Sequence, residues 1–132
     1  MIAAAIDGGG DVSTEQLFAR RVGPDRFELC CIPFFLYDIA LGDVVETDDD
    51  YLVRGVVEPS GRFVFRVWFG STSSPRDEEA QALADLGALL EWSSVNLLAV
   101  DARDGEHAQR IADHLQDAAD EGRLVFETGR TA

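Results

Sequence analysis

The fold is decided around the stretch Ile32-Pro33-Phe34-Phe35-Leu36-Tyr37-Asp38-Ile39-Ala40-Leu41-Gly42-Asp43-Val44-Val45. A dense apolar run meets a proline, a glycine and two acids here, without any break into low-complexity sequence. We expect a strand to end at Pro33, because proline is found at the ends of strands rather than in their centres. Residues 35–41 are predicted to form one helical turn before Gly42, and a new strand is expected to begin at Asp43.

Composition points to one globular domain with an unusual charge. The 132 residues are 46% hydrophobic and 27% charged, which is too apolar for a disordered chain. The 25 acids outnumber the 11 bases, all of them arginine, so that the net charge is -14. Such a field repels phosphate groups, so we exclude nucleic acid and anionic membranes as partners and expect a basic protein or cations. The alternative is that the charge serves only solubility.

The chain carries no signal for export or for a disulfide framework. Cys30 and Cys31 are adjacent on a predicted strand, where successive side chains point to opposite faces, so we expect two buried thiols in a reducing cytosol. The first six residues are too short for a signal peptide and lack its basic region, and no apolar run reaches the length of a membrane span. A cytoplasmic protein is expected.

In the first half the pattern predicts strands. Residues 1–12, which include Asp7-Gly8-Gly9-Gly10-Asp11, are expected to be a flexible leader rather than a phosphate-binding loop. Strands over 15–22 and 26–33 would form a hairpin around Gly23-Pro24-Asp25. Strands over 43–47, 51–58 and 62–69 would form an antiparallel meander, with Asp48-Asp49-Asp50 and Pro59-Ser60-Gly61 as turns.

The second half changes to helical periodicity. Ser74 is an expected helix cap, and apolar residues recur at helical spacing as far as Leu90. A strand over 95–100, a helix from Asp104 to Gly122 and a strand over 124–128 follow. Right-handed crossovers would place both helices on one face of a mixed sheet. We therefore predict a single α+β domain over residues 13–130, in which a largely antiparallel sheet continues into strand-helix-strand-helix-strand.

The meander supplies the candidate binding residues. If Pro59-Ser60-Gly61 is a three-residue loop, Arg54 faces Arg66 across the ladder, Leu52 faces Trp68 and Glu58 faces Arg62. The other face of the last strand is wholly apolar and is expected in the core: Phe63, Phe65, Val67 and Phe69. Two facing arginines repel unless an anion lies between them. Either an acid of the chain supplies it or a ligand or partner does, so the candidates are Arg54, Arg62, Arg66, Trp68, Glu46 and Glu58.

No local pattern indicates catalysis, a cofactor or a metal. The three aspartates at 48–50 lack the spacing of a calcium loop, and a polar turn is expected there. His107 and His114 lie seven residues apart on one predicted helix, about 10.5 Å along its axis, and cannot share a metal ion. We expect both to be solvated or hydrogen-bonded, and we predict neither catalytic residues nor metal ligands.

The stretch from Ile32 to Val45, together with Ser60-Gly61-Arg62 and Arg66-Val67, resembles the signature of the bacterial domain-of-unknown-function family 4265. The resemblance extends over residues 14–128 and implies a strand that ends in Pro-Phe-Phe, then Gly-Asp-Val-Val leading into the next strand. Cys31 stands where the family pattern often has asparagine. The resemblance implies no activity and no site residues.

The sequence favours a non-enzymatic cytoplasmic protein that binds another protein. The concrete hypothesis is an inhibitor like an immunity protein or antitoxin, whose acidic surface covers a basic toxin or nuclease. One alternative is a small-ligand-binding or regulatory domain that uses the face with Arg54, Arg66 and Trp68. A second alternative is an enzyme whose site assembles from distant residues.

Overall fold

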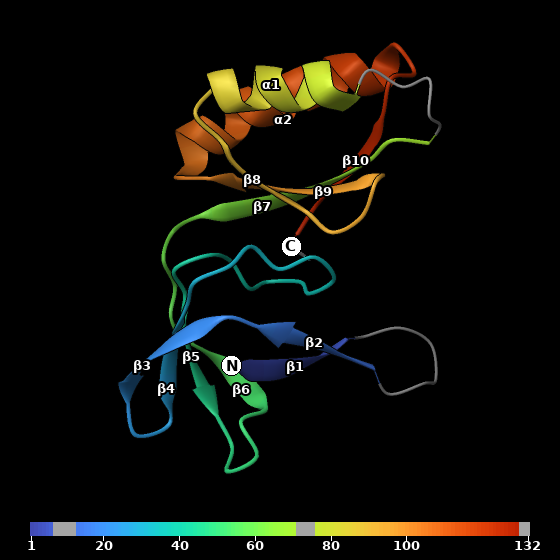
Figure 1. The fold of residues 1–132 in the computed structure, drawn as a ribbon. Helices are drawn as coiled ribbons and strands as arrows, with labels where there is room; N and C mark the ends of the chain where they lie inside the picture. Colours follow the sequence, from blue (N-terminus) through green and yellow to red (C-terminus); the bar gives the residue numbers. More distant parts are fainter. Residues whose placement is uncertain (7–12, 71–75, 130–132) are drawn as a thin grey trace.

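The computed structural model describes residues 1–6, 13–70 and 76–129. Over these residues the chain forms ten strands and two helices (Figure 1). An N-terminal half built only of strands lies below a C-terminal half in which two helices cover one face of a sheet (Figure 1). The predicted α+β class, with its hairpin, meander and antiparallel strands, is confirmed.

The N-terminal half contains two small antiparallel sheets. β1 pairs with β2, and β3 to β6 form a four-stranded sheet in sequence order. Phe18 separates β2 from β3, so one predicted strand becomes two that belong to different sheets. The bounds are β1 Ile2–Ile6, β2 Ser13–Leu17, β3 Ala19–Gly23, β4 Arg26–Leu29, β5 Val44–Thr47 and β6 Val53–Glu58.

The predicted flexible leader is wrong for residues 2–6, which form β1. Ile2 and Ala4 alternate toward the interior and are buried, and Ile2 lies opposite Leu17 of β2. Burial of these side chains offsets the entropy of ordering the N-terminus. The remainder of the predicted leader, residues 7–12, lies outside the described residues.

The C-terminal half has the strand order β10-β7-β9-β8. With the chain order strand-helix-strand-strand-helix-strand, this is a ferredoxin-like arrangement. The helices do share one face of the sheet, but the sheet is not mixed: each helix connects two parallel strands between which an antiparallel strand lies. The bounds are β7 Phe63–Trp68, α1 Arg76–Asp85, β8 Leu89–Trp92, β9 Leu97–Ala102, α2 Gly105–Asp120 and β10 Val125–Thr128.

The first helix is shorter than predicted, and the strand that follows it was missed. Gly87 has φ +90°, a left-handed conformation that ends helices, so the pattern does not continue to Leu90. Leu90 belongs to β8, opposite Val100 of β9. The second helix begins where predicted, because the Asp104 carboxylate accepts a hydrogen bond from the His107 amide. The predicted Ser74 cap lies outside the described residues.

The last strand of the predicted meander joins the other half of the molecule. β7 pairs with β9 and β10 and not with β6, so the meander consists of β4, β5 and β6 instead. Both faces of β7 are covered: Phe65 and Val67 lie in the core beneath the helices, while Val64 and Arg66 are buried on the opposite face. Such a strand is stable only in the centre of a sheet covered on both sides.

The apolar stretch that begins at Ile32 lies between the two halves. We call residues 32–43 the signature segment; it contains no helical turn over 35–41, contrary to the prediction. Its Ile32 and Ala40 pack with Val64 of β7 and Ala99 of β9 in a small buried cluster that joins the halves.

No helix in the described part of the chain is long and apolar enough to cross a membrane.

Candidate functional site

The signature segment is held by carboxylates from other elements. The Ile32 amide donates to Glu91 of β8 at 2.6 Å, and the amides of Phe34 and Phe35 donate to the two carboxylate oxygens of Glu15 at 2.8 and 3.0 Å. Backbone amides that no neighbouring strand satisfies need such partners when they are buried. The segment is therefore ordered without being a helix or a strand.

Asp43 connects the signature segment to the turn before β7. Its carboxylate accepts hydrogen bonds from the amides of Ala40 at 2.9 Å and Ser60 at 2.7 Å. The Ser60 hydroxyl in turn donates to the Leu41 carbonyl at 2.8 Å. Gly42 has φ +81°, and a Cβ there would lie 3.3 Å from the Ser60 Cβ. The Gly42-Asp43 and Ser60-Gly61 motifs thus hold the signature segment against the turn before β7, and we call this set of contacts the structural clamp.

Arg62 pairs with a buried acid and not with Glu58. Its Nε donates to both oxygens of Asp101 at 3.0 Å, and its Nη2 donates to the same carboxylate. Asp101 is fully buried on β9, while 28% of the Arg62 side chain is exposed. The hydrogen bonds to Asp101 raise the pKa of Arg62. This pair stabilises the chain internally and leaves Arg62 little freedom to bind a ligand.

Arg66 is buried in the joint between the halves, with 1% of its surface exposed. Its Nη2 donates to the Leu36 carbonyl, its Nη1 lies 3.5 Å from Glu127, and its guanidinium lies 4.9 Å from the centre of the Tyr37 ring. The Tyr37 hydroxyl donates to Glu127, which raises the pKa of Tyr37. The counterion of Arg66 is therefore Glu127, not Glu46 or Glu58.

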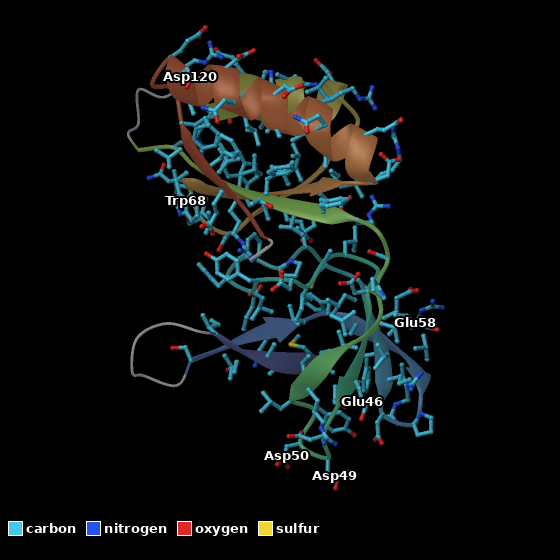
Figure 2. All side chains as sticks on the ribbon, turned by 180° about the vertical axis from the view of Figure 1, so that it is seen from behind. Glu46, Asp49, Asp50, Glu58, Trp68 and Asp120 are labelled. Atoms are coloured by element: carbon cyan, nitrogen blue, oxygen red, sulfur yellow. The ribbon has the colours of Figure 1, made fainter. Side chains whose placement is uncertain are left out.

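The remaining predicted site residues are scattered. Arg54 is exposed on β6, with Glu46 of β5 as a distant ion-pair partner at 3.9 Å. Figure 2 shows Glu46 and Glu58 in the half built of strands and Trp68 in the half that carries the helices. The predicted register of Arg54 against Arg66 is wrong, because β6 and β7 belong to different sheets. The face with Arg54, Arg66 and Trp68 does not exist.

The histidines and cysteines do not assemble a reactive centre with one another. His107 is fully buried, accepts from the Arg103 amide at 3.0 Å and bonds the Leu86 carbonyl at 2.8 Å. His114 lies 3.1 Å from Glu79 of α1. Among the described residues no group of three or more His, Cys, Asp or Glu side chains is placed to hold a metal ion.

The cysteines lie just beyond β4, not within a strand as predicted. Cys30 is exposed and Cys31 is half-buried. Burial raises the pKa of the Cys31 thiol to about 11. A thiol with such a pKa is protonated at neutral pH and is a poor nucleophile.

A groove lies between β1 and β6 beneath the signature segment. It has a volume of about 290 Å³ and is lined by Ala4, Ala5 and residues 35–39 and 53–55. Two of these side chains are exposed aromatics, Phe35 at 46% and Tyr37 at 41%. A smaller hollow of about 170 Å³ lies next to Asp43 and Arg62. The larger groove is close to the lower size limit of ligand pockets and is our candidate site.

Sequence reasoning missed the residues of this groove. The pattern assigned Phe35 and Tyr37 to a helical turn and placed Gly55 inside a predicted strand without giving it a role. Only Gly55 carried a usable signal, because a glycine inside a strand often marks a place where another backbone or a ligand approaches. Arg54 is the single predicted site residue that lines the groove.

Taken together, a ferredoxin-like half, a half of small antiparallel sheets and a carboxylate-bound segment between them define a composite α+β domain. The chain belongs to the family described as "Domain of unknown function (DUF4265)", whose sequence model matches residues 15–126. The family resemblance predicted from the signature is thus confirmed.

A solved structure supports the same fold. The chain is similar to a hypothetical protein from Neisseria gonorrhoeae, with 18% sequence identity and a TM-score of 0.81. The match covers 98% of this chain and 92% of the other. At this identity the likeness shows the fold alone. A search of curated proteins found no match.

Proposed function

We propose that this chain is a non-enzymatic protein that binds a basic protein partner, in the manner of an immunity protein or antitoxin-like inhibitor. The observation that carries the proposal is the excess of negative charge on the outer face of α2, where Arg110 is the one arginine of the helix. Asp113, Asp117 and Asp120 are exposed there, and none forms an ion pair with a described residue.

At two positions of α2 the i,i+4 partner of an aspartate is neutral rather than basic. Gln109 donates to Asp113 and Gln116 donates to Asp120, each at 2.9 Å and four residues apart. An amide satisfies the geometry of the carboxylate but leaves its charge in place. A surface that served only solubility would gain stability from i,i+4 partners of opposite charge instead.

Uncompensated charge of one sign acts mainly on the rate of association. Complementary fields raise association rates by roughly 10 to 1,000-fold, and this gain is lost as salt increases. The net charge of -14 adds to the local field of the helix face. The two free thiols, Cys30 and Cys31, are the state expected in a reducing compartment, which supports a cytoplasmic location as part of this proposal.

The test is stopped-flow association with a panel of purified basic nucleases, at low and at physiological salt, together with inhibition of each nuclease. Two triple variants remove equal charge from different places. The helix variant is Asp113→Asn, Asp117→Asn, Asp120→Asn; the control variant, in the exposed turns of the other half, is Asp25→Asn, Asp49→Asn, Asp50→Asn.

We expect at least one nuclease to bind with a rate that falls about tenfold or more as salt rises, and to be slowed more by the helix variant than by the control. Absence of binding across the panel, or a rate independent of salt, would contradict the proposal. Equal slowing by both triple variants would show that the helix face is not the contact.

A second candidate function, binding of a small ligand, is favoured by the groove between β1 and β6. This alternative no longer depends on the predicted face with Arg66 and Trp68. It would use Arg54 at the rim and the Phe35 and Tyr37 rings in the wall.

A further inference from the structure

β8 is an edge strand of the C-terminal sheet, and its open side carries unused backbone groups. The Ser93 amide donates to the Leu97 carbonyl at 2.9 Å, so Ser93 directs its backbone groups toward β9. Because alternate residues of a strand direct their N–H and C=O groups to the same side, Leu90 and Trp92 direct theirs away from β9. These amides and carbonyls form no hydrogen bond with another described residue.

β8 is also regular enough for another strand to pair with it. It pairs with β9 without a shift in register, from Leu89 opposite Asp101 to Trp92 opposite Leu98. By contrast β6, an edge strand of the other half, pairs with β5 with two register shifts. The free N–H and C=O groups of edge strands attract other strands, and proteins usually blunt such edges with charge, proline or bulges. β8 contains neither a proline nor a bulge.

Apolar side chains are exposed along this edge. Leu89 is 50% exposed, Trp92 is 40% exposed, and Val95, in the connection to β9, is 64% exposed. The Trp92 ring lies on the helix side of the sheet, 5.8 Å from the Phe69 ring, and Leu89 points to the opposite face. Exposed apolar surface therefore lies beside the free backbone groups on both faces of the sheet. Apolar surface of this kind often marks a site of interaction.

The edge carries little charge, although 27% of the residues of the chain are charged. Between residues 86 and 100 the one charged side chain is Glu91, and its carboxylate accepts a hydrogen bond from the Ile32 amide. Arg76, beside the strand, donates to the Val95 carbonyl at 2.5 Å, and its guanidinium lies over the Trp92 ring. Both charges near β8 are thus engaged within the chain.

The lack of charge favours a second copy of this chain as the occupant. Two chains of net charge -14 repel each other, so they approach most easily where neither presents charge. A basic protein is attracted instead to acidic surfaces, such as the outer face of α2. β10, the opposite edge of the sheet, contains Glu127 and follows Arg123, so it lacks this property.

The register of such a pair follows from the position of Glu91. A two-fold axis lets β8 pair with β8 of the second copy in antiparallel orientation. If Glu91 lay on this axis, two like charges would face each other directly, which is unfavourable. If Leu90 lies on the axis instead, each Glu91 lies opposite Leu89 of the second copy. The second register is therefore preferred.

We propose that two copies of this chain associate through β8, with Leu90 at the two-fold axis, and join their C-terminal sheets into one antiparallel sheet. The inference goes beyond the proposed function and does not rest on it. α1 packs against β8, whereas α2 packs against β9 and β10, so the acidic face of α2 lies away from the joint. The exposed acids of α1, Asp77 and Asp85, repel those of the second copy, and salt screens this repulsion.

The test is sedimentation equilibrium of the whole chain from micromolar to millimolar concentrations, at low and at high salt. Leu89→Lys and Leu89→Glu place opposite charges beside Glu91 of the second copy, at two symmetric places in one dimer. Val125→Lys and Val125→Glu are the matched controls, because Val125 is an exposed apolar residue that points to the same face at the opposite edge of the sheet.

We expect a monomer–dimer equilibrium whose dimer is tighter at high salt. The dissociation constant of Leu89→Glu should exceed that of Leu89→Lys by about tenfold or more, because each charge acts twice in the dimer. The two Val125 variants should have equal dissociation constants.

Hydrogen exchange locates the contact. The amides of Leu90 and Trp92 should exchange about tenfold more slowly at concentrations at which the dimer forms. The amide of Phe126 in β10, which also points away from its neighbouring strand, should not change.

A monomer throughout this range at high salt would overturn the inference, as would equal dissociation constants for the two Leu89 variants or slower exchange at Phe126 in place of Leu90. Salt strengthens the expected dimer but weakens the expected capture of a basic nuclease, so the two results are distinguishable. A chain that stays monomeric leaves the proposed function standing, and a chain that binds no nuclease leaves the dimer standing.

Discussion

Replacement of Asp43 by alanine tests whether the Gly-Asp and Ser-Gly motifs form a structural clamp. The Asp43 side chain is 5% exposed and accepts two backbone hydrogen bonds, from Ala40 at 2.9 Å and from Ser60 at 2.7 Å. The variant removes both acceptors at once. It also releases the turn before β7 from the signature segment, and so loosens the joint between the halves.

The expected loss of stability depends on whether each of the two donor amides, those of Ala40 and Ser60, is buried or exposed. Hydrogen bonds to a charged group contribute about 1.5–3 kcal/mol each, and a buried donor left without a partner costs about 1–3 kcal/mol. Ser60 is exposed, so water can replace its lost partner, whereas Ala40 is 7% exposed and its amide cannot be hydrated without opening the segment. We therefore expect the free energy of unfolding to fall by about 3–5 kcal/mol.

Urea denaturation followed by tryptophan fluorescence measures this loss, and calorimetry should show a melting temperature lower by about 10–20 °C. Asp43→Asn, which keeps one acceptor but turns an amide toward the second donor, should fall between parent and alanine. Asp49→Ala, at an exposed turn residue, should change stability by at most about 0.5 kcal/mol. A loss below about 1 kcal/mol for Asp43→Ala would refute the clamp.

Three further predictions concern the core, a buried ion pair and a thiol. Phe65 is 5% exposed beneath the helices, so Phe65→Ala should lower the free energy of unfolding by about 3–5 kcal/mol. Phe65→Leu should lower it clearly less, and urea denaturation measures both changes. Arg62→Ala should lower the free energy of unfolding by about 3 kcal/mol, because it leaves Asp101 buried without its counterion. Adding Asp101→Asn to this variant should restore part of the lost stability. If it restores none, the unpaired charge is not the cause of the loss. Because burial raises the pKa of Cys31 to about 11, its alkylation should still accelerate above pH 9, while Cys30 is labelled first at neutral pH by mass spectrometry.

Most elements of the fold could be predicted because their signals are local. The Asp104 cap and Gly122 bounded α2 correctly, and the alternation of Phe63, Phe65 and Val67 identified the core face of β7. β8 was missed because a left-handed glycine at position 87 breaks a helical pattern that the side chains alone continue. Helical periodicity and a short strand are hard to tell apart over four residues.

The candidate site could not be predicted from local pattern. Arg66 has the spacing of a solvent-facing strand residue, and only the signature segment, folded over β7, buries it against Glu127 and Tyr37. The groove likewise joins residues from the two ends of the N-terminal half with the segment that connects the halves. No spacing in the sequence reports such an encounter.

Local features of the sequence were sufficient to predict the class of the domain, its net charge, the inward face of β7, the bounds of α2 and the family. The net charge follows from composition alone, and the others depend on interactions between near neighbours, on caps and periodicity, or on short sequence motifs. Tertiary structure alone decided that β7 leaves the meander, that β1 is a strand, and which acid pairs with each arginine. These depend on the free energy of burying surfaces from distant segments against one another, a quantity that no single segment of the chain contains.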